Sequence, residues 1–336
     1  MKSPQIISSP LPDLNSLPYP DYTSFYGYKR IQAYPLITSR GCPYNCSFCA
    51  VHLISSRMWR PRKPDNCINE LKKAKETLPN LKAVVIQDDN PLVDSNRFEK
   101  FLRLFVDANF GWRLELINAR ADQIDDELVK LLKEAGCRTI GLGIEHGDPE
   151  VFRQIDKKES LEDIRRASEI VKRHGLKLNG CFIIGLPGDS FSKTYASINF
   201  AKQLSLDYVY WNMATPYRGT RIRSWYKQVG GQLFNEIGHS SYTAPSSCEE
   251  PLCESPDFTR EERRKAYLAA ILETNTTTPF TFYEFMPLLR LVPLAIKYNC
   301  QIKWFYWFLQ RMKTTALTMY SWLIPSLSRY FQISRE

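Results

Sequence analysis

Apolar and polar positions follow two alternating patterns along most of the chain. From Tyr34 onward, short β-branched or apolar runs alternate with longer segments whose apolar residues recur with helical period. This alternation is typical of βαβ units that build a parallel sheet. The short runs predict strands at 34–39, 82–87, 112–119, 138–144, 177–184 and 208–213.

The longer segments predict helices at 64–77, 96–109, 125–135, 161–174 and 190–204. Ser160, with Asp163 beyond it, indicates a capped helix start. Gly136 and Gly175 indicate helix ends, because glycine adopts the left-handed conformation without a Cβ penalty. We therefore expect an α/β fold, a partial (β/α)6 TIM-like barrel, with its chemistry at the C-terminal ends of the strands.

The pattern changes after Arg223, where the strand and helix alternation stops. We expect an N-terminal arm or linker at 1–30, a core domain at 31–223 and a mainly helical, aromatic and basic C-terminal extension at 224–336. A hydrophobic fraction of 43% and a charged fraction of 24% exclude disorder, collagen and coiled coil as descriptions of the whole chain.

Charge and cysteine content indicate which partners and which cellular compartment suit the protein. Lys and Arg number 45 against 36 Asp and Glu, so the net charge is +9 and anionic partners are favoured. The nine cysteines are too few for a disulfide scaffold and suit a reducing compartment. Residues 1–21 hold no continuous apolar segment, so we expect no secretion signal or anchor there. These features predict a cytoplasmic protein.

Residues 280–336 combine many aromatic and basic side chains. Such mixtures favour the headgroup boundary of a membrane, and the charge-free stretches are too short to span a bilayer. We expect this segment to contact a membrane surface peripherally or to face a lipophilic substrate. The alternative is a helical cap whose aromatic residues pack on the barrel or on a partner.

Three cysteines gather directly after the first predicted strand, in the segment Arg-Gly-Cys-Pro-Tyr-Asn-Cys-Ser-Phe-Cys at 40–49. Cys42, Cys46 and Cys49 can turn toward one centre, and soft thiolates suit an iron–sulfur cluster or zinc. Zinc stays open because His52 could complete a Cys3His site. Three thiolates on a four-iron cluster would leave one iron open to an external ligand.

The segment resembles the radical S-adenosylmethionine (SAM) superfamily, whose cysteines have the spacing of Cys42, Cys46 and Cys49, with an aromatic residue, here Phe48, before the third. The resemblance implies a [4Fe–4S] cluster on these thiols and SAM on the open iron. It also implies reductive SAM cleavage to a 5′-deoxyadenosyl radical, which takes hydrogen from a substrate. The substrate is unidentified, and we expect it to be lipophilic.

Further strand-end segments resemble the same family and imply SAM contacts. Residues 87–90 resemble the segment that receives the SAM amino group, and 143–147 resemble the polar stretch near the ribose, with His146 where the family has Ser. Residues 182–189 resemble the adenine segment, where we expect a side chain at 185 to block the approach. The residues assigned to SAM by this resemblance are Phe48, Asp88, Asp89, Asn90, Arg120, Glu145, Gly185 and Pro187. No catalytic acid or base is identified.

The subfamily it most resembles contains cobalamin-dependent enzymes related to the anaerobic magnesium-protoporphyrin cyclase and the hopanoid methylases. Residues 17–22 look like their interdomain linker, but the cobalamin-binding domain that precedes it there is not found in this sequence. The chain could begin where a partner ends, be a truncated product or work without cobalamin. Methyltransferase, cyclase and other radical chemistry all stay open.

The resemblance implies an electron donor such as a flavodoxin or ferredoxin and a small-molecule substrate. One alternative is a zinc-stabilised nucleic-acid-binding module, although the sequence has no recognisable reader motif and we expect no nucleic acid. The other alternative is a catalytically inactive scaffold of the same fold. The six remaining cysteines form no second compact motif, so no auxiliary cluster is expected.

Overall fold

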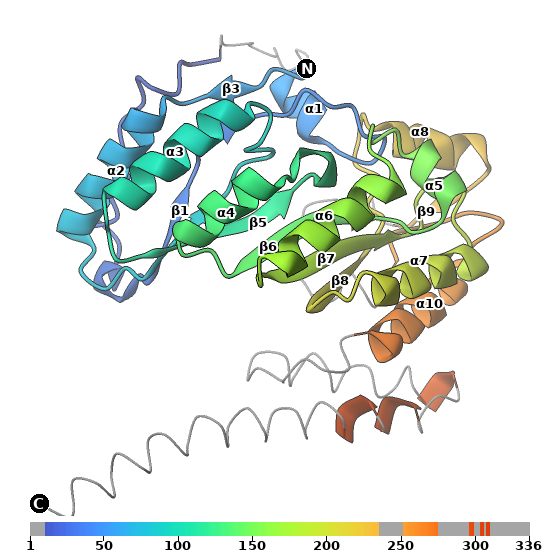
Figure 1. The fold of residues 1–336 in the computed structure, drawn as a ribbon. Coiled ribbons are helices and arrows are strands. Elements are labelled where there is room, and N and C mark those ends of the chain that lie inside the picture. The colour runs from blue at the N-terminus through green and yellow to red at the C-terminus, as the bar shows by residue number, and fades with distance from the viewer. Residues whose placement is uncertain (1–10, 235–250, 275–295, 299–302, 306, 310–336) are drawn as a thin grey trace, which may run out of the picture.

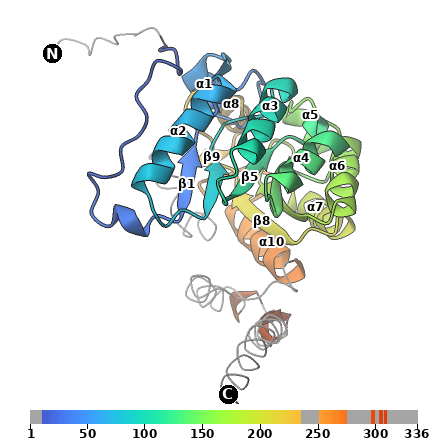
Figure 2. The same cartoon turned by 60° about the vertical axis from the view of Figure 1, so that its left-hand side comes forward.

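The computed structural model describes residues 11–234, 251–274, 296–298, 303–305 and 307–309 (Figures 1 and 2). Its centre is a six-stranded parallel sheet in the order β1-β4-β5-β6-β7-β8. The strands are β1 Ala33–Leu36, β4 Ala83–Ile86, β5 Arg113–Ala119, β6 Thr139–Glu145, β7 Lys177–Ile184 and β8 Tyr208–Met213. This confirms the α/β class and the partial barrel.

The long helices follow the strands and cover one face of the sheet (Figure 1). They are α2 Pro64–Thr77, α3 Ser95–Asp107, α4 Asp126–Glu134, α6 Leu161–Arg173 and α7 Phe191–Gln203. Each lies within two residues of its predicted bounds. Ser160 and Asp163 form the expected capping box on α6, and Gly136 and Gly175 have φ angles of 78° and 75°.

Short elements complete the described chain. They are η1 Tyr28–Arg30, β2 Ser39–Arg40 paired antiparallel with β3 Arg60–Pro61, α1 Val51–Ser55, η2 Ala121–Gln123, α5 Pro149–Gln154, α8 Arg221–Gln228, β9 Gln232–Leu233 paired with β10 Cys253–Glu254, and α10 Arg260–Glu273. The first predicted strand was too long at its end. The sheet strand stops at Leu36, and Ser39 instead begins β2, which leads into the cysteine segment and pairs with β3 after it.

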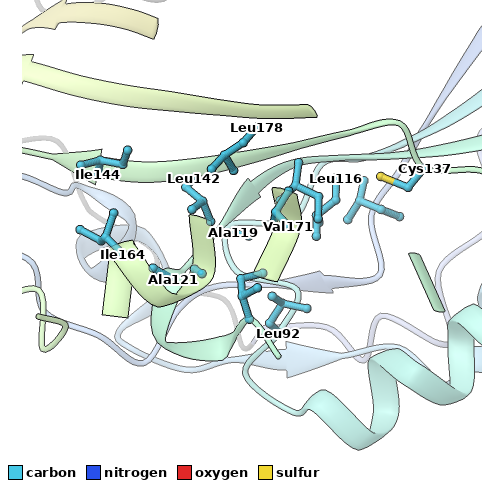
Figure 3. Packing of buried hydrophobic residues seen from close by; sticks show 14 of the residues in the cluster. Leu92, Leu116, Ala119, Ala121, Cys137, Leu142, Ile144, Ile164, Val171 and Leu178 are labelled. Carbon is cyan, nitrogen blue, oxygen red and sulfur yellow. The ribbon is translucent and has the colours of Figure 1, made fainter. Parts of the chain in front are cut away.

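The core lies between the sheet and its helices because alternate strand residues point to the helical side. Figure 3 shows Leu142 of β6 and Leu178 of β7 near Val171 of α6, while Leu116 and Ala119 come from β5. All five are at most 3% exposed. Their packing fixes the positions of the strand ends, where the predicted site residues lie.

The chain after β8 returns to the barrel. Helix α10 packs on α7 and lies below the sheet in Figure 1, and α8 runs through the predicted division at residue 224. The three-part domain division stays a prediction. Most of 280–336 lies outside the described residues, but Trp307 is 1% exposed and packs on Leu268 and Leu272 of α10. Within the described ranges, no helix is long and apolar enough to cross a membrane.

Candidate metal centre

The loop that carries the three cysteines begins at Gly41. Its φ is +89°, and a Cβ there would lie 2.0 Å from the carbonyl oxygen of Met58, so only glycine fits. The Gly41 N–H donates to Oδ2 of Asp89 at 2.8 Å. The predicted SAM segment after β4 is therefore bonded directly to the start of the cysteine loop.

Asp88, the buried neighbour of Asp89, binds the chain just before the cysteine loop. Its carboxylate accepts hydrogen bonds from the Thr38 N–H at 2.6 Å, the Thr38 hydroxyl at 2.6 Å and the Ser39 hydroxyl at 2.5 Å. Burial raises the pKa of Asp88 above its usual value. The carboxylate of Asp88 thus shapes the turn between β1 and β2, while the assignment of its segment to SAM through the backbone stays a prediction.

The second half of the cysteine loop is held by segments distant in sequence. The Ser47 N–H donates to the Ile155 carbonyl at 2.8 Å, and the Ile222 N–H of α8 donates to the Ser47 carbonyl at 2.9 Å. The Arg221 guanidinium also donates to the carbonyl oxygen of Asn45. Helix α8, which follows the last strand of the sheet, thus fixes the backbone between Cys42 and Cys49.

The three thiols are free and partly buried, and they act on one another. Burial, opposed by Lys157 and assisted by Glu145 and Cys49, raises the pKa of Cys46 to about 12. The pKa of Cys49 is also raised, mainly by burial and in part by Cys42. The thiols therefore lie within electrostatic reach of each other, as ligands of one centre must.

Arg120 joins the end of β5 to the cysteine loop. Its guanidinium lies over the Tyr44 ring at 3.6 Å from the centroid and binds both carboxylate oxygens of Asp122, at 3.0 and 2.8 Å. It also donates to the Lys157 carbonyl at 2.8 Å. Arg120 was predicted from the resemblance as a SAM contact. The structure places it beside the site with its donors already engaged by protein groups.

Lys157 is a buried site residue that sequence reasoning missed. Its ammonium group lies 3.3 Å from Oε1 of Glu145 and 3.2 Å from Oε2 of Glu159, and it donates to the Gly143 carbonyl. Lys157 also favours the ionised form of Cys46. The only signal was the charged run at 156–159, which is ordinarily typical of a solvated surface.

The predicted ribose and adenine residues lie at the ends of β6 and β7. Glu145 has an unusual φ of +69° and is 9% exposed, while His146 is 1% exposed with Nε2 at 3.1 Å from Oδ1 of Asp189. Gly185 follows β7, and Pro187 lies in the turn before α7. A Cβ on Gly185 would lie 2.3 Å from Nη1 of Arg263. A side chain at 185 would thus meet Arg263, and the expectation that it would also obstruct adenine stays a prediction.

The donor set at the loop suits a cluster better than a single ion. Among the described residues, no three His, Cys, Asp or Glu side chains are close enough together to hold one metal ion. A four-iron cluster binds each thiolate through a different iron and spreads its ligands more widely. Ser47 Oγ is buried at this loop without a hydrogen-bond partner in the described chain, and the Asn90 side chain lies within hydrogen-bonding reach of the Cys42 sulfur. Three free thiols, two nearby cations and these polar groups fit an anionic cluster.

Comparison with known proteins gives a family match for the core of the chain. A model of the radical SAM superfamily matches residues 36–201. An uncharacterized methyltransferase of Pyrococcus horikoshii is 29% identical over 269 residues, which cover 78% of this chain and 56% of that protein. An anaerobic magnesium-protoporphyrin IX monomethyl ester cyclase of Rubrivivax gelatinosus is 26% identical, covering 53% of this chain and 32% of the cyclase.

Among solved structures, the cobalamin-dependent SAM radical enzyme OxsB, with aqua-cobalamin and SAM bound, has a similar fold. Its TM-score is 0.55 at 15% identity, with 88% of this chain and 50% of OxsB covered. The chain spans about half the length, or less, of the relatives described here. These relatives agree with the subfamily that the sequence resembles. Residues 36–201 therefore form a radical SAM domain.

Proposed function

We propose that this protein binds a [4Fe–4S] cluster on Cys42, Cys46 and Cys49 and uses it to cleave SAM reductively. The observation that supports this most is the cysteine loop itself, whose three free, partly buried thiols lie on a backbone held by Asp89 and α8. The cluster, when bound with SAM, supplies one-electron cleavage of the sulfonium by an electron from an external reductant. The protein's own residues bind, orient and enclose the reactants.

The side chains around the thiols have distinct tasks in this proposal. Asp89 fixes the loop through the Gly41 N–H, and Asn90, 3% exposed, lies within hydrogen-bonding reach of the Cys42 sulfur. Glu145 is held by Lys157 at 3.3 Å and is assigned to the SAM ribose. Phe48 packs partly buried against the core and Pro187 shapes the turn after β7. Both are assigned to SAM on the family pattern.

We infer a substrate with a substantial apolar surface. The sheet face opposite the helices exposes Ile117 of β5 by 49% and Tyr210 of β8 by 47%. Exposed aliphatic and aromatic side chains on the inner wall of a barrel favour an apolar ligand. One relative is named for its action on magnesium-protoporphyrin IX monomethyl ester, which agrees with this class. Comparing small molecules that accumulate in a deletion strain would identify the substrate.

The remaining assignments of this proposal concern partners and location. A flavodoxin or ferredoxin would deliver the electron, and the setting would be cytoplasmic, with peripheral membrane contact through 280–336. Cobalamin binds the structural relative OxsB, and for this chain a cobalamin-binding partner protein is compatible with the segment at 17–22. The retained cysteines and buried polar groups favour an active enzyme over an inactive scaffold.

The experiment is anaerobic reconstitution followed by reduction with dithionite in the presence of SAM. We expect about four iron and four sulfide per chain and slow release of 5′-deoxyadenosine without substrate. Stoichiometric zinc without iron would contradict the cluster. An intact, reducible cluster that releases no deoxyadenosine would leave the inactive scaffold as the remaining explanation.

A further inference from the structure

Arg263 of α10 is an arginine buried in an unusual setting. It is 1% exposed, and its guanidinium donates to the Phe258 carbonyl at 3.0 Å, the Tyr226 hydroxyl at 2.7 Å and the Cys253 sulfur at 3.4 Å. Within the described chain it forms no ion pair at 4.0 Å or less. Burying a cation without a paired anion is costly. We therefore expect the charged side chain of Arg263 to have a role that a neutral side chain could not fill.

The Tyr226 hydroxyl connects Arg263 to the end of β7. Tyr226 lies on α8, is 0% exposed, and donates its hydroxyl proton to the carbonyl oxygen of Gly185. A guanidinium can only donate, so the Arg263 contact uses a lone pair of the hydroxyl and leaves its single proton for Gly185. Arg263 thus fixes the direction of the Tyr226 hydrogen bond. Burial also raises the pKa of Tyr226 and keeps that proton in place.

The other polar group of Gly185 is held just as firmly. Its N–H donates to Oδ2 of Asp189 at 2.7 Å, and its φ is +90°. Asp189 is 2% exposed and also accepts from the Ser190 N–H at 2.8 Å. Both the N–H and the carbonyl of Gly185 are therefore directed by buried side chains. The backbone that begins the turn at 185–188 has little freedom to rotate.

We infer that Tyr226 and Arg263 are positioning residues for SAM, because they fix the Gly185 carbonyl and with it the turn assigned to adenine. We call this pair the Gly185 clamp. Both residues lie beyond the family match at 36–201, so the clamp extends the SAM site into α8 and α10. The inference rests on the proposed function, which assigns this turn to SAM.

Tyr226→Phe tests the clamp with a matched control. The variant removes one buried hydroxyl, which leaves the Gly185 carbonyl without its donor and the Arg263 guanidinium without one of its acceptors. Tyr34→Phe removes an equally buried hydroxyl, which donates to Oε1 of Glu70 at 2.7 Å on β1 and α2. Tyr226→Phe loses two buried hydrogen bonds and Tyr34→Phe loses one, so Tyr226→Phe should lose more stability, and the affinity for SAM is the readout that separates the two variants. Only Tyr226→Phe should change the affinity for SAM.

The measurements are the SAM dissociation constant of anaerobically reconstituted protein and the KM and kcat for 5′-deoxyadenosine release. For Tyr226→Phe we expect the dissociation constant and KM to rise roughly tenfold, with kcat much less affected. Arg263→Lys keeps the charge but has a single donor group, and we expect a smaller rise in the same two quantities. It also serves if Tyr226→Phe does not fold.

Two outcomes separate this inference from the proposed function. If the wild-type protein releases deoxyadenosine, but SAM affinity in Tyr226→Phe or Arg263→Lys equals that in Tyr34→Phe, the clamp has only a structural role and the inference is overturned. If the wild-type protein with an intact cluster releases no deoxyadenosine, the proposed reaction fails. The dissociation constants then still decide whether the clamp positions SAM.

Discussion

The guanidinium of Arg120 lies over the ring of Tyr44, with 3.6 Å between its central carbon and the ring centroid. Tyr44 stands between Cys42 and Cys46, so this contact ties the cysteine loop to the end of β5. Arg120 is held from behind by Asp122 and by Glu159, whose Oε1 lies 3.3 Å from Nε. The loop thus rests on a buried ionic group before any cluster binds.

Tyr44 variants test this support. Tyr44→Leu removes the cation–π contact, which contributes about 1 kcal/mol, and we expect less iron retained after reconstitution and gel filtration. Tyr44→Phe keeps the ring and should load iron as the wild type does. Equal iron content in Tyr44→Leu and Tyr44→Phe would mean that the stacked arginine has no part in ordering the loop.

Alanine variants of the three loop cysteines can be compared with an alanine variant of a cysteine outside the loop. Cys42→Ala, Cys46→Ala and Cys49→Ala should each abolish SAM cleavage and lower the bound iron well below about four per chain. Cys67→Ala removes a fully buried thiol of α2 and should leave the iron content unchanged. Wild-type iron in any of the three loop variants would remove that cysteine from the ligand set.

Alanine substitutions at Gly185 and Gly175 distinguish the cost of a steric clash from the cost of the backbone conformation. Both have positive φ angles, 90° and 75°, but a Cβ at 185 meets Arg263 whereas nothing lies within 4 Å of one at 175. Gly175→Ala should cost only about 1–2 kcal/mol of unfolding free energy, for the left-handed conformation. Gly185→Ala should cost clearly more, as measured by urea unfolding. Equal losses would show that Arg263 moves aside freely.

Glu159 should make the stability depend on pH. Burial raises its pKa from 4.5 to about 7, so the folded protein holds this proton more tightly than the unfolded chain does. Its contribution is fully present below 4.5 and is lost as the pH rises through about 7. Between these values, wild-type unfolding free energy should fall relative to Glu159→Gln. Parallel pH profiles of the two proteins would show that Glu159 titrates normally.

The membrane expectation is tested by flotation with liposomes that contain anionic lipid. The full chain should float with the vesicles and lose binding at high salt, because the attraction is electrostatic. Truncation after Pro279 should also abolish it. Recovery that is the same with and without liposomes would favour packing of the aromatic residues on the protein, as already seen for Trp307 on α10.

The sequence predicted those parts of the molecule that depend on local patterns. Strands, helices and the capping box at Ser160 follow from residue spacing, and the spacing of the three cysteines predicts the cluster site. The contacts that decide individual roles could not be predicted, because they join distant positions. Gly185 meets Arg263 and Tyr226 from separate helices. Lys157 lies in a charged run, and only the tertiary fold buries it beside Cys46.

Because the six strands are parallel, their N-terminal ends all lie at one edge of the sheet, away from the cysteine loop. Probes can be attached at this edge without disturbing the reaction. The turns at Gly111 and Gly175 precede β5 and β7 and therefore lie at the edge opposite the cysteine loop. A side chain at either glycine would project into open space, at the cost of the left-handed backbone conformation already given for Gly175→Ala. A spin label or an immobilising tag placed there would report on the cluster from a fixed scaffold, which suits anaerobic work on a surface.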